Sequence, residues 1–271
     1  MRPLLYFFSL TYIISWSLFF VAKIISGDVS YPDSSFSPLG YIIYIVGVFT
    51  PALVASFLSW REKGKAGVQA LLTRIIKAPN DWRWYVFAVG YFIFIKMFIA
   101  IIHRLTTGEW PLFGHESFFL ILIAIIFSTP IQAGEEIGWR GYALPRLSER
   151  FGLATASIIL GIIWATWHLP FFFFQNADKY GQSFPVYLLS VIGLSVAMAW
   201  LYWRTNSSLF ITMLMHSAVN NTTGIVSSVS QEAKNPFSLN ASPIAWGTTA
   251  TLFVFAVYFL YQMRSAKLKL V

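Results

Sequence analysis

The chain has 271 residues, of which 57% are hydrophobic and 11% are charged, and its formal net charge is +8. Because a soluble domain carries about 25% charged residues, this composition excludes a soluble globular protein. Cysteine is absent, which excludes disulfides, thiolate metal ligands and cysteine nucleophiles. We therefore predict an all-α, polytopic integral membrane protein.

Apolar runs long enough to cross a bilayer follow one another along the chain. Because one crossing takes about 20 apolar residues, we expect about eight spans. They are residues 4–25, 38–60, 84–103, 117–140, 153–174, 184–203, 207–228 and 243–263. The sequence contains no internal repeat and no second soluble domain, so we interpret residues 1–271 as a single integral membrane domain. The predicted fold is a transmembrane helix bundle.

Lysine and arginine gather at alternate ends of these spans, and positively charged loops stay in the cytoplasm. The segments predicted to be cytoplasmic contain Arg2, Arg61, Lys63, Lys65, Arg74, Lys77, Arg83, Arg140, Arg146, Arg150, Arg204, Arg264, Lys267 and Lys269. This distribution predicts an N-in, C-in topology. The net charge is therefore explained by membrane topology and by membrane lipids as partners. The sequence has no separate basic domain of the kind that would bind a nucleic acid.

Residues 61–81 connect the second and third spans and pair basic positions with apolar residues at helical spacing. The apolar positions are Val68, Leu71, Leu72, Ile75 and Ile76. Such a pattern predicts an amphipathic helix at the cytoplasmic interface. A solvated connector is the alternative interpretation.

Three of the predicted spans carry polar or ionisable side chains. They are Glu135, Glu136 and Arg140 in the fourth span, His168 in the fifth, and His216 with Asn220 in the seventh. Burying such groups in hydrocarbon costs several kcal/mol each without partners, so they mark a candidate functional site. At about 1.5 Å per residue, their positions along antiparallel helices predict one common polar layer.

Spacing separates the two adjacent glutamates. Glu136 and Arg140 are four residues apart, so they share a helix face and can form an ion pair. Glu135 is rotated by about 100° from Glu136 and faces a different neighbour. One carboxylate can therefore be structural and the other chemical. His216 and Asn220 are also four apart and present an imidazole and an amide on one face.

The run EEIGWRGYALPRL, which contains Glu135 and Arg140, resembles the EExxxR motif of the CPBP family. This family comprises the CAAX protease and bacteriocin-processing (Abi) membrane proteins, including type II CAAX endopeptidases. His168 and the HxxxN pattern from His216 to Asn220 resemble the family's later motifs, in the same order. The resemblance covers about residues 115–225. Trp164 stands where the family more often has Phe.

The resemblance implies an intramembrane endopeptidase of the Rce1 type. In such an enzyme, Glu135 and His168 activate water, and His216 with Asn220 stabilise the oxyanion. Glu136 and Arg140 position the site or bind a substrate carboxylate, and Trp164 shapes the substrate pocket. The implied substrate is a membrane-associated peptide, prenylated and CAAX-like in some members and a precursor peptide in others. We expect the plasma membrane of a prokaryote, with the active site opening toward the cytoplasm.

Metal use stays open at this stage. Glu135, His168 and His216 could supply three ligands and leave a fourth position for water, as in a zinc metalloprotease. The same residues can activate water without a metal, and the HExxH signature is absent. We predict no obligatory cofactor, with zinc or another divalent metal as the alternative.

Two other functions stay open as well. A non-catalytic member of the family would act as a membrane scaffold or a bacteriocin-immunity protein. A transporter would also bury ionisable residues, along a proton or ion pathway. Against a transporter, the chain has no inverted repeat and no paired broken helices, and its polar residues lie in one half of the sequence.

Overall fold

The computed structural model describes residues 2–27, 36–175, 177–227 and 235–268. Regular structure in these ranges is helical, apart from one isolated bridge between Phe113 and Val226. The longer helices are α1 (Arg2–Ser26), α2 (Pro38–Leu72), α3 (Arg83–Thr107), α4 (Phe118–Ser128), α7 (Leu153–Trp167), α8 (Phe184–Arg204), α9 (Leu209–Thr222) and α10 (Pro243–Met263). Shorter helices are η1 (Thr129–Gln132), α5 (Ala133–Glu136), η2 (Ile137–Ala143), α6 (Leu144–Phe151), η3 (Leu169–Phe172) and η4 (Thr223–Ile225). The all-α prediction is confirmed.

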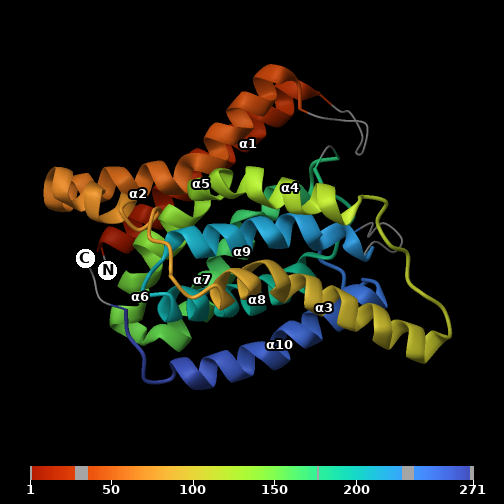
Figure 1. Ribbon diagram of the computed structural model, residues 1–271. Coiled ribbons are helices and arrows are strands. Elements are labelled where there is room, and N and C mark those ends of the chain that lie inside the picture. Colours follow the sequence, from red (N-terminus) through yellow and green to blue (C-terminus); the bar gives the residue numbers. More distant parts are fainter. Residues whose placement is uncertain (1, 28–35, 176, 228–234, 269–271) are drawn as a thin grey trace.

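Among the described residues, 6 helices are long and apolar enough to cross a membrane. They are α1, α2, α3, the combined segment Phe118–Phe151, α8 and α10. The chain is therefore an integral membrane protein. α1 begins and α10 ends at the same end of the bundle (Figure 1), which suits an N-in, C-in arrangement. Which end faces the cytoplasm stays a prediction.

Two of the predicted spans form shorter helices than expected. The span at 153–174 contains α7, which has 15 residues and ends at Trp167. Pro170 disfavours α-helix at the preceding residue, so the chain continues as the 3₁₀-helix η3. The span at 207–228 contains α9, which has 14 residues before η4, and residue 228 lies outside the described residues. Apolar sequence in these two segments reflects burial inside the bundle as well as contact with lipid.

The segment that carries the adjacent glutamates is irregular. Between α4 and α6 the chain passes through a 3₁₀ turn, the short α5 and the π-helix η2, which begins directly after Glu136. Gly138 allows this segment to approach α2, because a Cβ there would lie 2.7 Å from the backbone carbon of Pro51. π-Helical turns occur mostly at functional sites. The local backbone is therefore set by packing against α2.

Helix α2 changes direction at Gly64, whose φ of 61° is favourable only for glycine. The segment beyond Gly64 buries Gly67, Leu71 and Arg74 against the protein, while Leu72 and Ile76 are exposed. The predicted amphipathic segment is thus helical as far as Leu72 and has one buried and one exposed face. Figure 1 shows that it projects at the end of the bundle where the chain termini lie.

The centre of the bundle is formed by α7, α8 and α9, with the other long helices around them (Figure 1). α9 buries most of its residues, including His216. α1 and α10 are exposed along most of their length, as expected for helices that face lipid. The candidate residues therefore lie on helices whose neighbours exclude solvent.

Candidate active site

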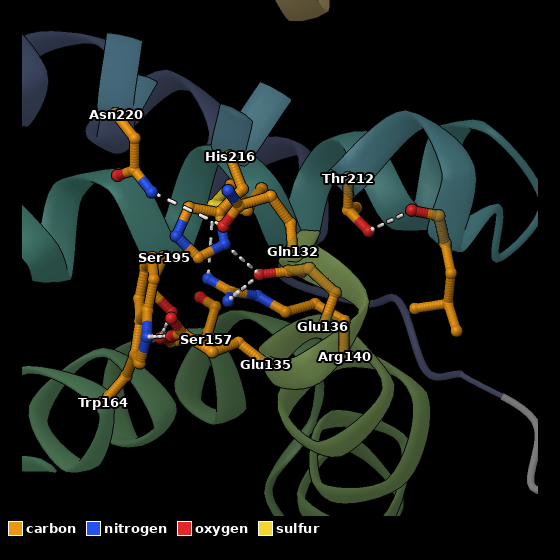
Figure 2. Close-up of polar contacts among 12 residues, drawn as sticks. Gln132, Glu135, Glu136, Arg140, Ser157, Trp164, Ser195, Thr212, His216 and Asn220 are labelled. Carbon is orange, nitrogen blue, oxygen red and sulfur yellow. Dashed lines mark hydrogen bonds and ion pairs between the residues drawn. The ribbon is translucent and has the colours of Figure 1, made fainter. Parts of the chain in front are cut away.

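Glu135 and Glu136 end the short helix α5 beside the core helices, and both side chains are buried. Their carboxylates point to different neighbours, as Figure 2 shows. Glu136 is directed toward α9 and Glu135 toward α7. The rotation between adjacent helical residues predicts this divergence.

Glu136 lies in an ion-paired cluster, which we define as Glu136, Arg140 and His216. Nη1 of Arg140 donates to Oε1 of Glu136 at 2.8 Å, so the ion pair predicted from the spacing is present. Nδ1 of His216 lies 2.9 Å from the same oxygen. The guanidinium of Arg140 also contacts Sδ of Met198 at 3.3 Å and stacks 4.2 Å from the ring centroid of Trp164. All charge in this cluster is shielded from solvent.

The cluster determines the tautomer of His216. An ionised carboxylate only accepts hydrogen bonds, so Nδ1 of His216 carries the proton that is donated to Glu136. Nε2 of the neutral ring then has no proton. The carboxylate of Glu136 meets two donors at one oxygen, while its other oxygen, Oε2, has no hydrogen-bond partner among the described residues.

Glu135 has a different environment. Its Oε2 accepts one hydrogen bond from Nε1 of Trp164, at 2.6 Å, and this donor is neutral. The backbone carbonyl of Trp164 lies 2.9 Å from Nδ1 of His168. Because a carbonyl only accepts, Nδ1 of His168 is the donor and Nε2 of the neutral ring keeps its lone pair. Trp164 therefore bridges the carboxylate of Glu135 and the imidazole of His168.

The imidazole of His168 is half-buried in an aromatic surround. Its ring centroid lies 4.8 Å from that of Trp167, 5.7 Å from that of Tyr187 and 6.2 Å from that of Phe171, all in edge-to-face geometry. These contacts restrict rotation of the ring. The orientation of Nε2 is therefore set by packing as well as by the hydrogen bond at Nδ1.

Asn220 lies one turn beyond His216 on α9. Its Nδ2 donates to Oε1 of Gln132 at 3.4 Å, which is a long hydrogen bond (Figure 2). Further hydrogen bonds, which we call the polar seam, join α9 to the end of α4. The hydroxyls of Ser128 and Ser217 are 2.7 Å apart, and Asn221 donates to Ser128 at 2.8 Å. The seam sets the position of α9 against the segment that carries Glu135.

The three residues predicted as alternative metal ligands do not converge. Nδ1 of His216 is directed to Glu136 and Nδ1 of His168 to the carbonyl of Trp164, so Nε2 is the atom of each ring that could bind a metal. Within the described ranges no group of three or more His, Cys, Asp or Glu residues could hold a metal ion. Glu135, His168 and His216 therefore do not meet as a three-ligand group in this structure.

Sequence reasoning missed several contacts of the site. Gln132 contacts Asn220, Met198 contacts Arg140, and Tyr187 packs on His168. Gln132 had a local signal, because it lies three residues before Glu135 and on the same side of the helix. Met198 and Tyr187 lie on α8 and had none, since apolar and aromatic residues occur throughout that span.

Comparison with known proteins gives two matches. Residues 115–222 match the sequence model of the Rce1-like type II CAAX prenyl endopeptidases. The chain is also 25% identical over 230 residues to CAAX prenyl protease 2 of Methanococcus maripaludis, covering 81% of this chain and 83% of that protein. The range matched by the family includes the candidate site residues Glu135, Glu136, His168, His216 and Asn220. Over these residues the chain is therefore similar to the Rce1-like type II CAAX prenyl endopeptidases.

Proposed function

We propose that this protein is a glutamate-dependent intramembrane endopeptidase that hydrolyses a peptide bond in a membrane-associated peptide, CAAX-like or a precursor. One observation carries the proposal. Of two adjacent buried carboxylates, Glu136 is neutralised by Arg140, whereas Glu135 is held by a neutral indole donor beside an imidazole. A carboxylate without a cationic partner keeps its capacity to take a proton.

Glu135 is assigned as the general base. Its carboxylate takes a proton from a water molecule as the oxygen of that water attacks the scissile carbonyl carbon. His168 presents the lone pair of Nε2 and orients the same water, because Nδ1 is occupied by the carbonyl of Trp164. Glu135, then protonated, gives this proton to the amide nitrogen as the carbon–nitrogen bond breaks and the oxyanion re-forms a carbonyl. The products are a carboxylic acid and an amine, and Glu135 is again a carboxylate.

His216 and Asn220 are assigned to the oxyanion that forms on the scissile carbonyl. The amide of Asn220 is a donor in every protonation state. His216 can donate through Nε2 when its ring is an imidazolium, with Nδ1 still directed to Oε1 of Glu136 at 2.9 Å. Donors in a site of low dielectric constant stabilise such charge strongly. The Glu136 carboxylate acts here through His216 and does not contact the substrate.

Arg140, Glu136 and Trp164 are assigned to positioning, and Trp164 also to the wall of the substrate pocket. Residues 115–225 would form the catalytic core within a single membrane domain, 1–271. The proposed location is the plasma membrane of a prokaryote. The Lys and Arg residues at the helix ends predicted to be cytoplasmic support an orientation with the site open to the cytoplasm. A CAAX-like substrate, prenylated at its cysteine, suits this location because its lipid would enter between helices from the bilayer.

The test is cleavage of fluorogenic peptides by detergent-purified protein, using farnesylated CAAX peptides and unmodified precursor peptides in parallel. Glu135→Gln keeps the shape of the side chain and removes the base, so we expect a fall in cleavage of about 100-fold or more. Glu109→Gln, at an exposed loop position, is the matched control and keeps full activity. Undiminished cleavage by Glu135→Gln would overturn the assignment. Absence of cleavage by the wild type on both peptide sets would favour a scaffold.

A further inference from the structure

Arg74 is a buried cation outside the site described above. It follows α2 on the segment beyond Gly64 and is 9% exposed. Charged residues are rarely buried unless they are paired or hydrogen-bonded. Nη1 of Arg74 donates to the carbonyl oxygen of Gly141 at 3.2 Å and to the hydroxyl of Tyr202 at 2.7 Å. Both acceptors are neutral groups. We therefore look for the reason for the burial of Arg74 in the need of these two acceptors for a hydrogen-bond donor.

The carbonyl of Gly141 lies in the π-helix η2, four residues before Pro145. Proline has no N–H, so the α-helical donor to this carbonyl is absent, and the π-helical donor would be the amide of Arg146. Arg74 donates to the same carbonyl from the segment that follows α2. Gly141 also allows that segment to approach closely, since a Cβ there would lie 2.8 Å from Cδ1 of Leu71. A side chain from a different part of the chain is thus hydrogen-bonded to the backbone beside Arg140.

The backbone of the same segment holds the beginning of α9. The carbonyl of Arg74 accepts from the amide of Leu209 at 3.0 Å, and Nζ of Lys77 donates to the carbonyl of Asn206 at 2.6 Å. The hydroxyl of Ser208 donates to the carbonyl of Lys77. Asn206 has a positive φ of 53°, which is uncommon for a residue other than glycine. Several hydrogen bonds therefore hold the turn between α8 and α9 against the segment that follows α2.

These contacts join the two segments that meet at Glu136. Gly141 directly follows Arg140, and α9, which begins at Leu209, carries His216. Arg140 and His216 converge on one oxygen of Glu136. We propose that Arg74 is a positioning residue that holds the Arg140 segment and the start of α9 in register, so that the ion-paired cluster stays assembled. The link to catalysis rests on the proposed function.

The first test compares Arg74→Met with Arg61→Met, an exposed position on α2. We measure kcat, KM and hydrogen exchange of backbone amides in detergent. For Arg74→Met we expect kcat to fall about 10- to 100-fold with KM little changed, because small displacements of a site group cost this much. Exchange should rise in residues 137–147 and 205–216 and stay unchanged elsewhere, and Arg61→Met should match the wild type. Unchanged kcat and exchange in Arg74→Met would overturn the proposal.

A second variant separates positioning from a general loss of packing. Pro145→Ala restores an amide that can donate to the carbonyl of Gly141 in α-helical register and to that of Arg140 in π-helical register. In the double variant Arg74→Met, Pro145→Ala we therefore expect recovery of kcat and of amide protection in residues 137–147, measured in a complete double-mutant cycle. Effects that simply add, or a rise in exchange throughout the bundle, would contradict the inference. Arg74→Lys, which keeps the charge, provides the same comparison if the methionine variant does not fold.

The exchange measurement also distinguishes this inference from the proposed function. If the wild type cleaves no peptide, but Arg74→Met loosens only residues 137–147 and 205–216 and Pro145→Ala reverses the loss, the anchoring role stands and the peptidase assignment fails. If the wild type cleaves and neither kcat nor exchange responds to Arg74→Met, the peptidase assignment stands and the anchoring role fails.

Discussion

The two adjacent glutamates of the buried site, Glu136 and Glu135, have different hydrogen-bond partners. On one side, the ion-paired cluster gives Glu136 two donors at a single oxygen, one of them cationic. On the other, Glu135 meets the neutral indole of Trp164, whose carbonyl binds His168. The contrast separates a carboxylate with a cationic partner from a carboxylate whose hydrogen-bond donor is neutral. Adjacent positions in the chain thus support different roles.

The physical origin of the difference is rotation about one helix. Successive residues point about 100° apart, so Glu136 reaches α9 and Glu135 reaches α7. Each partner helix then supplies what the carboxylate meets. Predictions that perturb one side should therefore change stability, and predictions that perturb the other should change the rate of cleavage.

The largest expected effect comes from Arg140→Met on the ion-paired cluster. Removing the guanidinium leaves a buried carboxylate without its cation, which should lower the free energy of unfolding by about 3–5 kcal/mol. Thermal unfolding in detergent measures this. Arg146→Met is the control, because its ion pair with Glu62 is partly exposed and should contribute no more than about 1 kcal/mol. Equal losses in both variants would contradict the distinction between the two environments.

On the Glu135 side, His168→Asn should act on rate. The asparagine amide can keep the hydrogen bond to the carbonyl of Trp164, but the lone pair of Nε2 is lost. We expect cleavage to fall about 100-fold, with a change in unfolding free energy below about 1 kcal/mol. His103→Asn is the control, since its Nδ1 also lies near a carbonyl, that of Glu109. A loss of stability without a loss of rate would reverse the assigned roles.

Trp164→Phe tests the bridge between Glu135 and His168. An aromatic ring and the backbone carbonyl stay, while the indole N–H donor is removed together with the five-membered part of the bicycle. Losing one hydrogen bond to a carboxylate should cost about 1.5–3 kcal/mol, measured as reduced cleavage together with reduced unfolding free energy. Trp203→Phe, on α8, should change neither by more than about 0.5 kcal/mol. Wild-type behaviour of Trp164→Phe would show that Glu135 is held by other groups.

The smallest effect is expected for Gln132→Met, which removes the acceptor of Asn220. The hydrogen bond is long, at 3.4 Å, so its loss should lower cleavage only about two- to fivefold, near 0.5–1 kcal/mol. Gln69→Met, at an exposed position, serves as the control. A loss as large as that of Asn220→Ala would mean that Gln132 contributes to the reaction through more than this contact.

Local patterns were sufficient for part of the site. The four-residue spacing predicts the contact between Glu136 and Arg140, which is present at 2.8 Å. The level of Glu135 and His168 along antiparallel helices predicts that they lie near each other, and Trp164 bridges them. The partner of His216 was not predictable in this way, because equal depth does not say which carboxylate a rotated helix faces.

Other features depended on contacts between distant parts of the chain. The π-helix after Glu136 depends on close packing of Gly138 against Pro51 and on Arg74, which lies 67 residues before the carbonyl it binds. The eight apolar runs likewise do not distinguish lipid from a protein core, and α7 and α9 are shorter than a crossing requires. An apolar segment is predicted to be removed from water, but its hydropathy does not tell whether lipid or other parts of the protein surround it.

The amino-acid sequence alone determined that this is a helical membrane protein, which residues are costly to bury, and which of them share a helix face, because composition and periodicity act within a single helix. Only the tertiary structure decided that His216 pairs with Glu136, that Trp164 donates to Glu135, and that Arg74 donates to the carbonyl of Gly141. These pairings depend on how helices rotate and approach one another, and packing of the whole bundle sets both.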